Sequence, residues 1–363
     1  MSIINDIEIK NFKSIRHQKI EGCKRINVFV GEPNVGKSNI LEAISIFGLL
    51  DFSISQPITL QNLTRVNKNH QLFFNGLIDK NINISLNKNL ELDISADTNL
   101  DLSFSAIEKF PVTAPIDTST WKNYPKRTDF NSFQISNINE KIKATDISHL
   151  THLNPIRPVR KYIFTKSSLT SKYDTLTKHL IFPFGENISD IIFSNSEIKN
   201  QFIKLFEIYD LRISRFEKDG KINILKELPD SSFLILDYDL IADTLQRLIF
   251  FKAAILSNKN SVLLFEEPEA HMYPPYISKF TSDMVYDENG NQFFIATHSP
   301  YVINDIMENL KKDDYAIYTV GYDKENGETL IRRMTDEELH EIYQYGVDLF
   351  LNLENFLPHA QQQ

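Results

Sequence analysis

The chain of 363 residues contains a single cysteine, Cys23, and this scarcity limits the chemistry open to it. One thiol has no partner for an internal disulfide and supplies too few ligands for a cysteine-based zinc site. We therefore expect a protein of a reducing compartment, the cytoplasm. The first residues also lack the charged and then apolar pattern of a secretory signal.

Long apolar runs and an excess of positive charge are missing as well. No uninterrupted apolar stretch approaches the ~18 residues of a membrane span, so we expect a soluble protein with no membrane partner. The formal net charge of −9 does not favour a chain that coats nucleic acid along its whole surface. No internal repeat and no sustained heptad pattern is present, which argues against long coiled-coil arms.

The most informative stretch runs from Gly31 to Ser38 and reads G-x-x-x-x-G-K-S. It follows an alternating, β-branched run at 25–30 that predicts a strand, and it precedes a run at 39–47 with helical spacing. Glycines let backbone N–H groups close on phosphate, and the dipole of the following helix favours negative charge. In this pattern we expect Lys37 to reach the β- and γ-phosphates and the Ser38 hydroxyl to bind magnesium. The sequence therefore predicts a site for a nucleoside triphosphate with Mg²⁺.

Two carboxylates follow the apolar run Ser261–Phe265, which predicts a buried parallel strand. Carboxylates at the end of such a strand are costly to bury unless they meet a metal ion or a polarised water. We expect Glu266 to hold magnesium or its water shell, and Glu267 to orient or deprotonate the attacking water. An ordinary acidic loop after a strand is the alternative interpretation.

A third apolar run, at 292–296, predicts a strand that ends shortly before His298. Near a γ-phosphate, an imidazole can donate a hydrogen bond to a phosphate oxygen as charge builds in the transition state. A histidine after a strand is more often a simple loop residue. Because this histidine follows the phosphate loop and the paired carboxylates in the chain, we favour a catalytic role for it.

The segments GEPNVGKSN, LLFEEPEAH and IATHSP, in that order, resemble the ABC-type ATPases of the structural-maintenance-of-chromosomes (SMC), RecF and OLD group. This group is often catalogued as AAA-like ATPases of prokaryotic antiviral-defence and DNA-repair systems. The run at 7–15 is similar to the group's N-terminal hairpin. The resemblance implies an α/β fold, a P-loop NTPase of ABC/SMC-head type with a mixed sheet, flanking helices and an antiparallel β lobe. It also implies that ATP and Mg²⁺ lie between two heads of a homodimer or higher homo-oligomer that regulates a separate effector.

The resemblance further implies roles for individual residues. Around the nucleotide phosphates it places Gly31, Asn34, Gly36, Lys37, Ser38 and Asn39. Ser38 and Glu266 would be the metal ligands, Glu267 the catalytic carboxylate and His298 the switch histidine. The segment from Asn11 to Lys13 would lie near the base and the α-phosphate.

Two parts of the group's pattern are altered or unassigned. The group presents a Ser-Gly signature at a helix start, which reaches the γ-phosphate of the partner head, whereas this chain has Ala242 and Thr244 at those positions. The lost hydroxyl and the added charge of Asp243 predict hydrolysis that is slow or depends on a partner. A packed amphipathic helix is the alternative. The glutamine that helps to hold magnesium has three candidates, which are Gln56, Gln61 and Gln71.

The pattern of strands, helices and polar connections predicts four parts. They are the N-terminal part of the ATPase head at 1–105, an inserted and mainly helical lobe at 106–230, the C-terminal part of the head at 231–335, and a helical tail at 336–363. Three alternating runs at 82–104 predict an antiparallel meander. Helices are predicted near 240–256 and 276–285.

Other functions remain open at this stage. Basic residues cluster between Lys10 and Arg25 and again at 157–161, where they either contact nucleic-acid phosphates or form a solvated face. Asp237 and Asp239 resemble the metal-binding Asp-x-Asp of a Toprim-type nuclease, which is an alternative of another enzyme class. A nucleotide-gated structural clamp or sensor, in which hydrolysis is incidental, is the third candidate.

Overall fold

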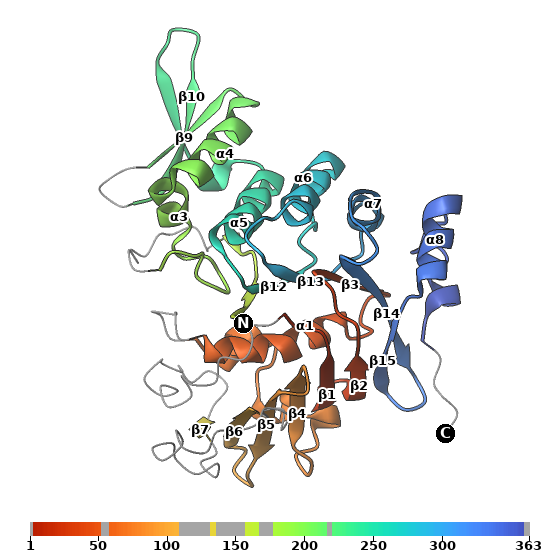
Figure 1. Cartoon of the computed structure of the whole chain (residues 1–363). Helices are drawn as coiled ribbons and strands as arrows, with labels where there is room; N and C mark the ends of the chain where they lie inside the picture. The colour runs from red at the N-terminus through yellow and green to blue at the C-terminus, as the bar shows by residue number, and fades with distance from the viewer. Residues whose placement is uncertain are drawn as a thin grey trace, which may run out of the picture.

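A computed structural model of the chain shows, within the described residues, two six-stranded sheets with one helix between them and a smaller three-stranded sheet (Figure 1). The residues that it describes are 3–51, 58–108, 131–135, 157–166, 177–215 and 220–358. The helix between the sheets is α1 (Lys37–Ser45). On the opposite face of the central sheet lie α5 (Asp243–Ser257), α6 (Pro274–Val285) and α7 (Pro300–Asn309).

The central sheet carries the predicted motifs at one edge. Its strands are β3 (Ile26–Gly31), β8 (Val159–Tyr162), β12 (Val262–Glu266), β13 (Gln292–Ala296), β14 (Tyr315–Asp323) and β15 (Glu328–Arg333). Within the described residues their order is β15-β14-β3-β13-β12-β8, and only β15 runs antiparallel to its neighbour. The middle strands β3, β12 and β13 are apolar and buried because helices cover both faces. Their carboxyl ends therefore bring the phosphate loop, the paired carboxylates and the histidine loop together.

The second sheet is antiparallel and includes the predicted meander. Its strands are β1 (Ile7–Phe12), β2 (Ile15–Ile20), β4 (Ile82–Leu86), β5 (Leu90–Ala96), β6 (Leu102–Glu108) and β7 (Asn131–Ile135). Their order in the described chain is β2-β1-β4-β5-β6-β7. The expected pairing of three successive strands at 82–104 is confirmed by β4, β5 and β6. Short helical segments connect the two sheets: η1 (Ile46–Leu50), α2 (Leu60–Leu63), η2 (Asn69–Leu72) and η3 (Phe74–Gly76).

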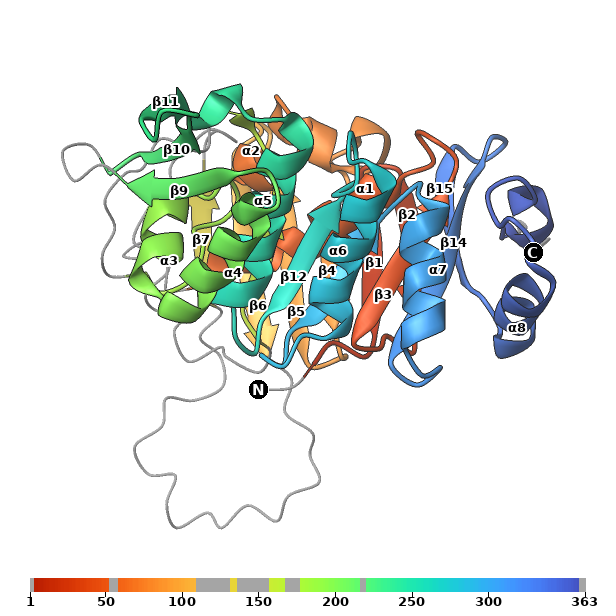
Figure 2. The same cartoon turned by 90° about the horizontal axis from the view of Figure 1, so that it is seen from above.

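A smaller lobe lies at one end of the molecule (Figures 1 and 2). It contains α3 (Ile188–Ser194), α4 (Ser196–Glu207), β9 (Leu211–Arg215), β10 (Ile222–Glu227) and β11 (Phe233–Asp237). The three strands form an antiparallel sheet, and α3 and α4 pack against α5. Strand β8 lies within the stretch expected to form the inserted lobe, yet it pairs with β12 at the edge of the central sheet.

The C-terminal part beyond β15 consists of α8 (Asp336–Tyr345) and η7 (Leu353–Phe356). Thr335 and Glu338 form a capping box that starts α8, and Gly346 ends the helix with a left-handed backbone. The chain then returns to β14, where the Thr319 hydroxyl donates to the Phe356 carbonyl at 2.7 Å. In the described ranges, no helix combines the length and the apolar character needed to cross a bilayer.

Aromatic packing fixes the helices on the central sheet. The Phe265 ring of β12 lies 5.4 Å from Phe251 of α5 and 5.8 Å from Phe280 of α6, measured between ring centroids. Both pairs adopt edge-to-face geometry, which contributes roughly 0.5–1.5 kcal/mol per pair beyond the burial itself. Helix α5 is thereby held firmly, and with it the altered signature segment at its start.

Two hydroxyl side chains hold the phosphate loop from outside. The Thr329 hydroxyl of β15 donates to the Val35 carbonyl at 2.8 Å and lies 2.6 Å from the Ser14 hydroxyl in the turn between β1 and β2. The Asn39 amide of α1 donates to the same Ser14 oxygen at 2.7 Å. Gly36 has a φ of +102°, and a Cβ there would lie 2.1 Å from the Thr329 hydroxyl oxygen. Only glycine fits this position.

We expect Gly36→Ala to lower the free energy of unfolding by about 2–3 kcal/mol, because backbone strain and the clash with Thr329 act together. Gly346→Ala is the matched control. Its φ is +63°, but no atom lies within 4 Å of an added Cβ, so only the backbone penalty of about 1 kcal/mol applies. Urea unfolding of both variants measures the difference. Equal losses would contradict the tight packing around the loop.

Candidate active site

The phosphate loop encloses its own lysine. Gly31 ends β3 so close to β14 that a Cβ there would lie 2.3 Å from the Val320 carbonyl oxygen. Lys37 begins α1 and is buried, and its Nζ donates to the carbonyls of Gly31 at 2.9 Å and Glu32 at 2.7 Å. Burial lowers the pKa of Lys37 to about 8, although nearby carboxylates favour its charged form. Phosphate oxygens are stronger acceptors for this ammonium than the loop carbonyls.

The two predicted metal ligands meet directly. The Ser38 hydroxyl donates to Glu266 Oε1 across the gap between α1 and β12. A hydroxyl and a carboxylate oxygen at a helix start, beside a phosphate loop, are the hard oxygen ligands that Mg²⁺ prefers. The residues present therefore fit magnesium, and Ser38 and Glu266 are those that would hold it.

Glu267 and His298 lie side by side at the same edge. Glu267 takes a left-handed backbone with a φ of 42°, and its side chain is 51% exposed. His298 Nε2 lies 3.7 Å from Glu267 Oε1. Burial and the charge of Lys37 lower the pKa of His298, which leaves the imidazole neutral at neutral pH. The arrangement offers a solvent-accessible carboxylate to a water molecule and an imidazole N–H to a phosphate oxygen.

A third carboxylate, which the sequence analysis did not assign, orients the histidine loop. Glu269 is buried, and its Oε1 accepts hydrogen bonds from the Thr297 hydroxyl at 2.5 Å and from the His298 backbone N–H at 3.1 Å. Burial raises the pKa of Glu269. The E-E-P-E spacing contains this residue, but only the fold shows that it points at the neighbouring strand end.

The remaining predicted nucleotide contacts have partners or backbone roles within the chain itself. Asn34 supplies a left-handed backbone position in the loop, with a φ of 63°, and the Asn39 side chain is bound to Ser14. The Asn11 amide donates to the Asn81 carbonyl at 3.0 Å. Lys13 pairs with Glu42 of α1.

Of the three candidate glutamines, two bind residues of their own segment. The Gln61 amide donates to the Asn67 side chain at 3.1 Å. Gln71 accepts from the backbone N–H groups of Asn67 and Lys68, at 2.9 and 3.1 Å. Gln56 lies outside the described residues.

A buried lysine on β8 contacts the predicted metal ligand Glu266. Lys161 has a fully buried side chain, and its Nζ lies 3.6 Å from Glu266 Oε2 and 3.8 Å from Glu42 Oε1. It also donates to the Leu63 carbonyl at 3.2 Å. Burial lowers the pKa of Lys161 to about 8 and Glu42 opposes that shift, so the ammonium is largely charged at neutral pH. Lys161 is thus a positioning residue for Glu266.

Arg65 completes the same cluster from the exposed side. Its guanidinium donates to Glu266 Oε1, and its Nε lies 3.7 Å from Glu42 Oε1. The Arg65 side chain is 63% exposed, whereas that of Lys161 is buried. A divalent cation held by Ser38 and Glu266 would repel this exposed guanidinium.

The basic segment at 157–161 is not a solvated face. Arg160 is 5% exposed and donates to Asp51 Oδ2 at 2.7 Å, and Lys161 is 1% exposed. The expectation of surface charge was wrong for these two residues. Strand β8 is the last strand of the central sheet, but α1 and the segment after it cover its side chains. Their burial also excludes them from contact with nucleic acid.

The nuclease alternative gains no support from the geometry. Asp237 ends β11, and Asp239 lies in η6 (Tyr238–Leu240), both in the small lobe. Across the described ranges, no three carboxylate, histidine or cysteine side chains gather as a metal-binding group. An Asp-x-Asp pair alone does not complete a nuclease metal centre.

The altered signature segment lies next to the loop that follows β12. Helix α5 begins after Ala242, which provides no side-chain cap. The Thr244 hydroxyl donates to the His271 carbonyl at 2.8 Å, and Asp243 binds Arg247 at 3.0 Å. Thr244 therefore has a structural role within its own head.

These features define a P-loop ATPase of the ABC/SMC-head type. The chain belongs to the family described as "AAA domain, putative AbiEii toxin, Type IV TA system", whose model matches residues 26–304. The match spans the phosphate loop, the paired carboxylates and the histidine loop, which the structure places at one edge of the sheet.

The chain is also similar to individual proteins and to solved structures. An "ATP/GTP phosphatase" of Helicobacter pylori is 22% identical over 358 residues, covering 87% of this chain and 91% of that protein. "Protein ea59" of Escherichia phage lambda is 30% identical over 176 residues, which are 42% of this chain and 33% of that one. The Smc head domain of Pyrococcus furiosus, bound to the C-terminal domain of ScpA, matches with a TM-score of 0.51 and 13% identity over 95% of this chain and 99% of that one. That likeness shows the shared fold.

We expect Lys161→Met to lower the free energy of unfolding by about 3 kcal/mol or more, since it leaves two buried carboxylates with one cation fewer. Arg65→Ala is the contrast, because it removes a cation from the same two carboxylates at an exposed position. Its cost should stay below about 1 kcal/mol. Urea unfolding monitored by circular dichroism measures both. Similar small losses would show that Lys161 does not stabilise the cluster.

Proposed function

We propose that this protein hydrolyses ATP with Mg²⁺ between two heads of a homodimer, and that the bound nucleotide switches a separate effector protein. The observation that carries the proposal is the convergence of Lys37, Ser38, Glu266, Glu267 and His298 at the carboxyl ends of three adjacent strands. Each residue has the chemistry that one role in phosphoryl transfer requires. The name of the Helicobacter pylori relative supports the same reaction.

In the proposed reaction, water attacks the γ-phosphorus and the bond to the β–γ bridging oxygen breaks, which yields ADP and phosphate. Glu267 accepts a proton from the water, because its carboxylate is accessible and lies next to the phosphate loop. Lys37 and the His298 imidazole donate to oxygens on which negative charge builds. Magnesium held by Ser38 and Glu266 would neutralise the β- and γ-phosphate oxygens.

A second head is part of the proposal because, in the group that the motifs resemble, the signature helix reaches the γ-phosphate of the partner head. The N-terminus of α5 carries backbone N–H groups without a side-chain cap, which suits a phosphate of the partner head. It lacks the serine hydroxyl of the signature, so we propose slow hydrolysis that a partner accelerates. The family description and the ScpA-bound fold relative favour a separate effector and a role in defence or repair.

The first test separates binding from hydrolysis. Lys37→Ala should abolish ATP binding, since the buried ammonium is the main cation of the loop. Glu267→Gln should keep ATP binding but lower the hydrolysis rate at least 100-fold, the order of magnitude of lost general-base catalysis, ~10²–10⁴. Light scattering should then show dimers that persist with ATP and Mg²⁺. Glu341→Gln, on the exposed face of α8, is the control for an amide in place of a carboxylate.

The outcome also discriminates the clamp or sensor alternative. If Glu267→Gln protein regulates its effector as well as the unchanged protein does, binding alone suffices and hydrolysis is incidental. If Lys37→Ala protein still binds and hydrolyses ATP normally, the proposed site is wrong.

A second test concerns the altered signature. Ala242→Ser restores a hydroxyl donor at the start of α5, and we expect it to raise the hydrolysis rate several-fold, as one further charge-assisted hydrogen bond would. The rate should rise with protein concentration, because the donor acts on the partner head. Ser257→Ala and Ala254→Ser, at the other end of α5, are controls for helix stability. An unchanged rate with intact dimerisation would show that α5 does not contact phosphate.

A further inference from the structure

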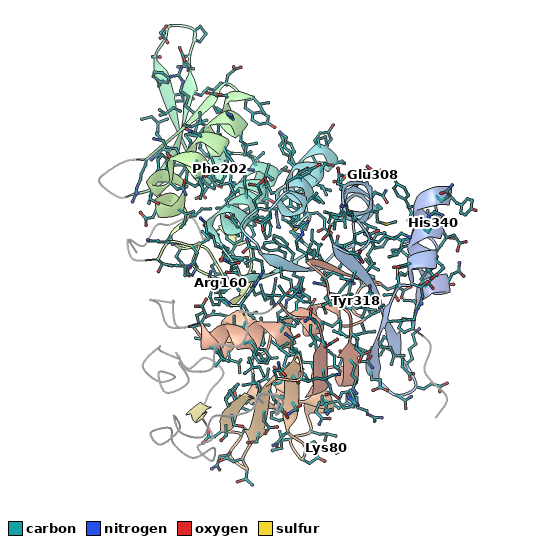
Figure 3. All side chains as sticks on the ribbon, in the orientation of Figure 1. Lys80, Arg160, Phe202, Glu308, Tyr318 and His340 are labelled. Atoms are coloured by element: carbon teal, nitrogen blue, oxygen red, sulfur yellow. The ribbon has the colours of Figure 1, made fainter. Side chains whose placement is uncertain are left out.

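A basic cavity lies at the edge of the central sheet opposite the phosphate loop. Its volume is about 400 Å³, and it opens between α3, α4 and the C-terminal end of α5. Arg160 of β8 lies at the cavity, below the two lobe helices (Figure 3). This volume lies in the range of ~300–1,000 Å³ that small-molecule sites occupy.

The charged side chains that line the described part of the cavity are all basic. Lys178, His179, Lys259 and Arg160 line it, and the described part of the wall has no aspartate or glutamate. This is unexpected in a chain with a net charge of −9. Within the described residues, the ammonium groups of Lys178 and Lys259 have no carboxylate partner, whereas Arg160 is neutralised by Asp51. Two lysine side chains that have no carboxylate partner in the described part of the chain therefore line this cavity.

The remaining lining has two further properties. Ile191 of α3, Ile198 of α4 and Leu256 of α5 form an apolar wall. Helix α4 starts beside the cavity with Asn195 as its N-cap, whereas α3 and α5 end there at Ser194 and Ser257, so the positive charge of the cavity comes from its lysines and not from helix dipoles. A dianion with an apolar body matches both the charges and the wall.

We propose that this cavity binds a small phosphomonoester with a flat or apolar body, of the size of a nucleoside monophosphate. The two lysines would hold the dianionic phosphate, and the three aliphatic side chains would contact the body. The site is distinct from the phosphate loop and does not depend on the function proposed above.

The cavity shares two elements with the ATP site. Ser257 ends α5 at the cavity, while the altered signature begins the same helix about 22 Å away, at ~1.5 Å per residue. Arg160 at the cavity immediately precedes Lys161, which contacts the metal carboxylate. A ligand here would thus touch both structures that serve the nucleotide.

Calorimetric titration of AMP into the full chain tests the proposal. The Lys37→Ala background silences the phosphate loop, and the added pair Lys178→Glu and Lys259→Glu should weaken AMP binding at least ~10-fold by repelling its phosphate. The matched control is Lys80→Glu with Lys311→Glu, which makes the same charge change at exposed sites away from the cavity and should leave AMP affinity unchanged. If the Lys178→Glu and Lys259→Glu protein fails to fold, the milder pair Lys178→Gln and Lys259→Gln replaces it. The melting temperature of that variant shows whether it is folded.

Inorganic phosphate is the second probe. It should bind more weakly than AMP because it cannot contact the apolar wall, and equal affinity would overturn the assignment of an apolar body. The proposal is wrong if AMP does not bind to the Lys37→Ala protein, or if the cavity and control pairs weaken AMP equally. It is also wrong if a short single-stranded oligonucleotide binds through Lys178 and Lys259 while AMP does not.

Discussion

The buried ion pair between Lys161 and the carboxylates of Glu42 and Glu266 is the interaction on which the rest of the site depends. Glu42 lies one turn after Ser38 in α1, and Glu266 ends β12. Burial makes each carboxylate costly unless a cation faces it. Lys161 on β8 faces both carboxylates, and Lys13 also pairs with Glu42, so Lys161 ties the phosphate-loop helix to the strand that carries the predicted metal ligand. The second cation, Arg65, contacts the same two carboxylates but is exposed. The cluster therefore has a buried cation and an exposed one.

This division explains how one head can respond to nucleotide. The Ser38 hydroxyl donates to Glu266, and Lys37 donates to the carbonyls of its own loop. These are the groups that magnesium and phosphate would contact in the proposed complex. In the proposed complex, a divalent cation at Ser38 and Glu266 would repel the exposed Arg65 guanidinium beside them.

Much of the fold follows from local sequence because each motif joins a hydrophobic run to a polar end. The strand before Gly31, the apolar run before Glu266 and the strand at 292–296 are all visible, and parallel pairing brings their ends together without further information. Lys161 and Glu269 were not predicted because their roles arise from neighbours distant in sequence. Strand β8 has four residues, two of them charged, and resembles a basic surface segment until its pairing with β12 is known. The hairpin of β14 and β15 was likewise missed, although Thr329 in it sets the space around Gly36.

The same long-range pairing places different side chains at the carboxyl ends and at the amino ends of the parallel strands. Parallel strands place all phosphate-facing groups at their carboxyl ends, where α1 begins. The amino ends of β8 and β12 meet the small lobe instead, and there Lys178 and Lys259 surround a cavity without a described carboxylate. Helix α5 and strand β8 run from one edge to the other, with aromatic rings that fix α5 on β12. A rigid helix and a strand that carries adjacent Arg160 and Lys161 are short physical connections between the edges. A ligand in this cavity would contact α5, which carries the altered signature segment at its other end, and β8, which carries Lys161 beside the predicted metal ligand Glu266.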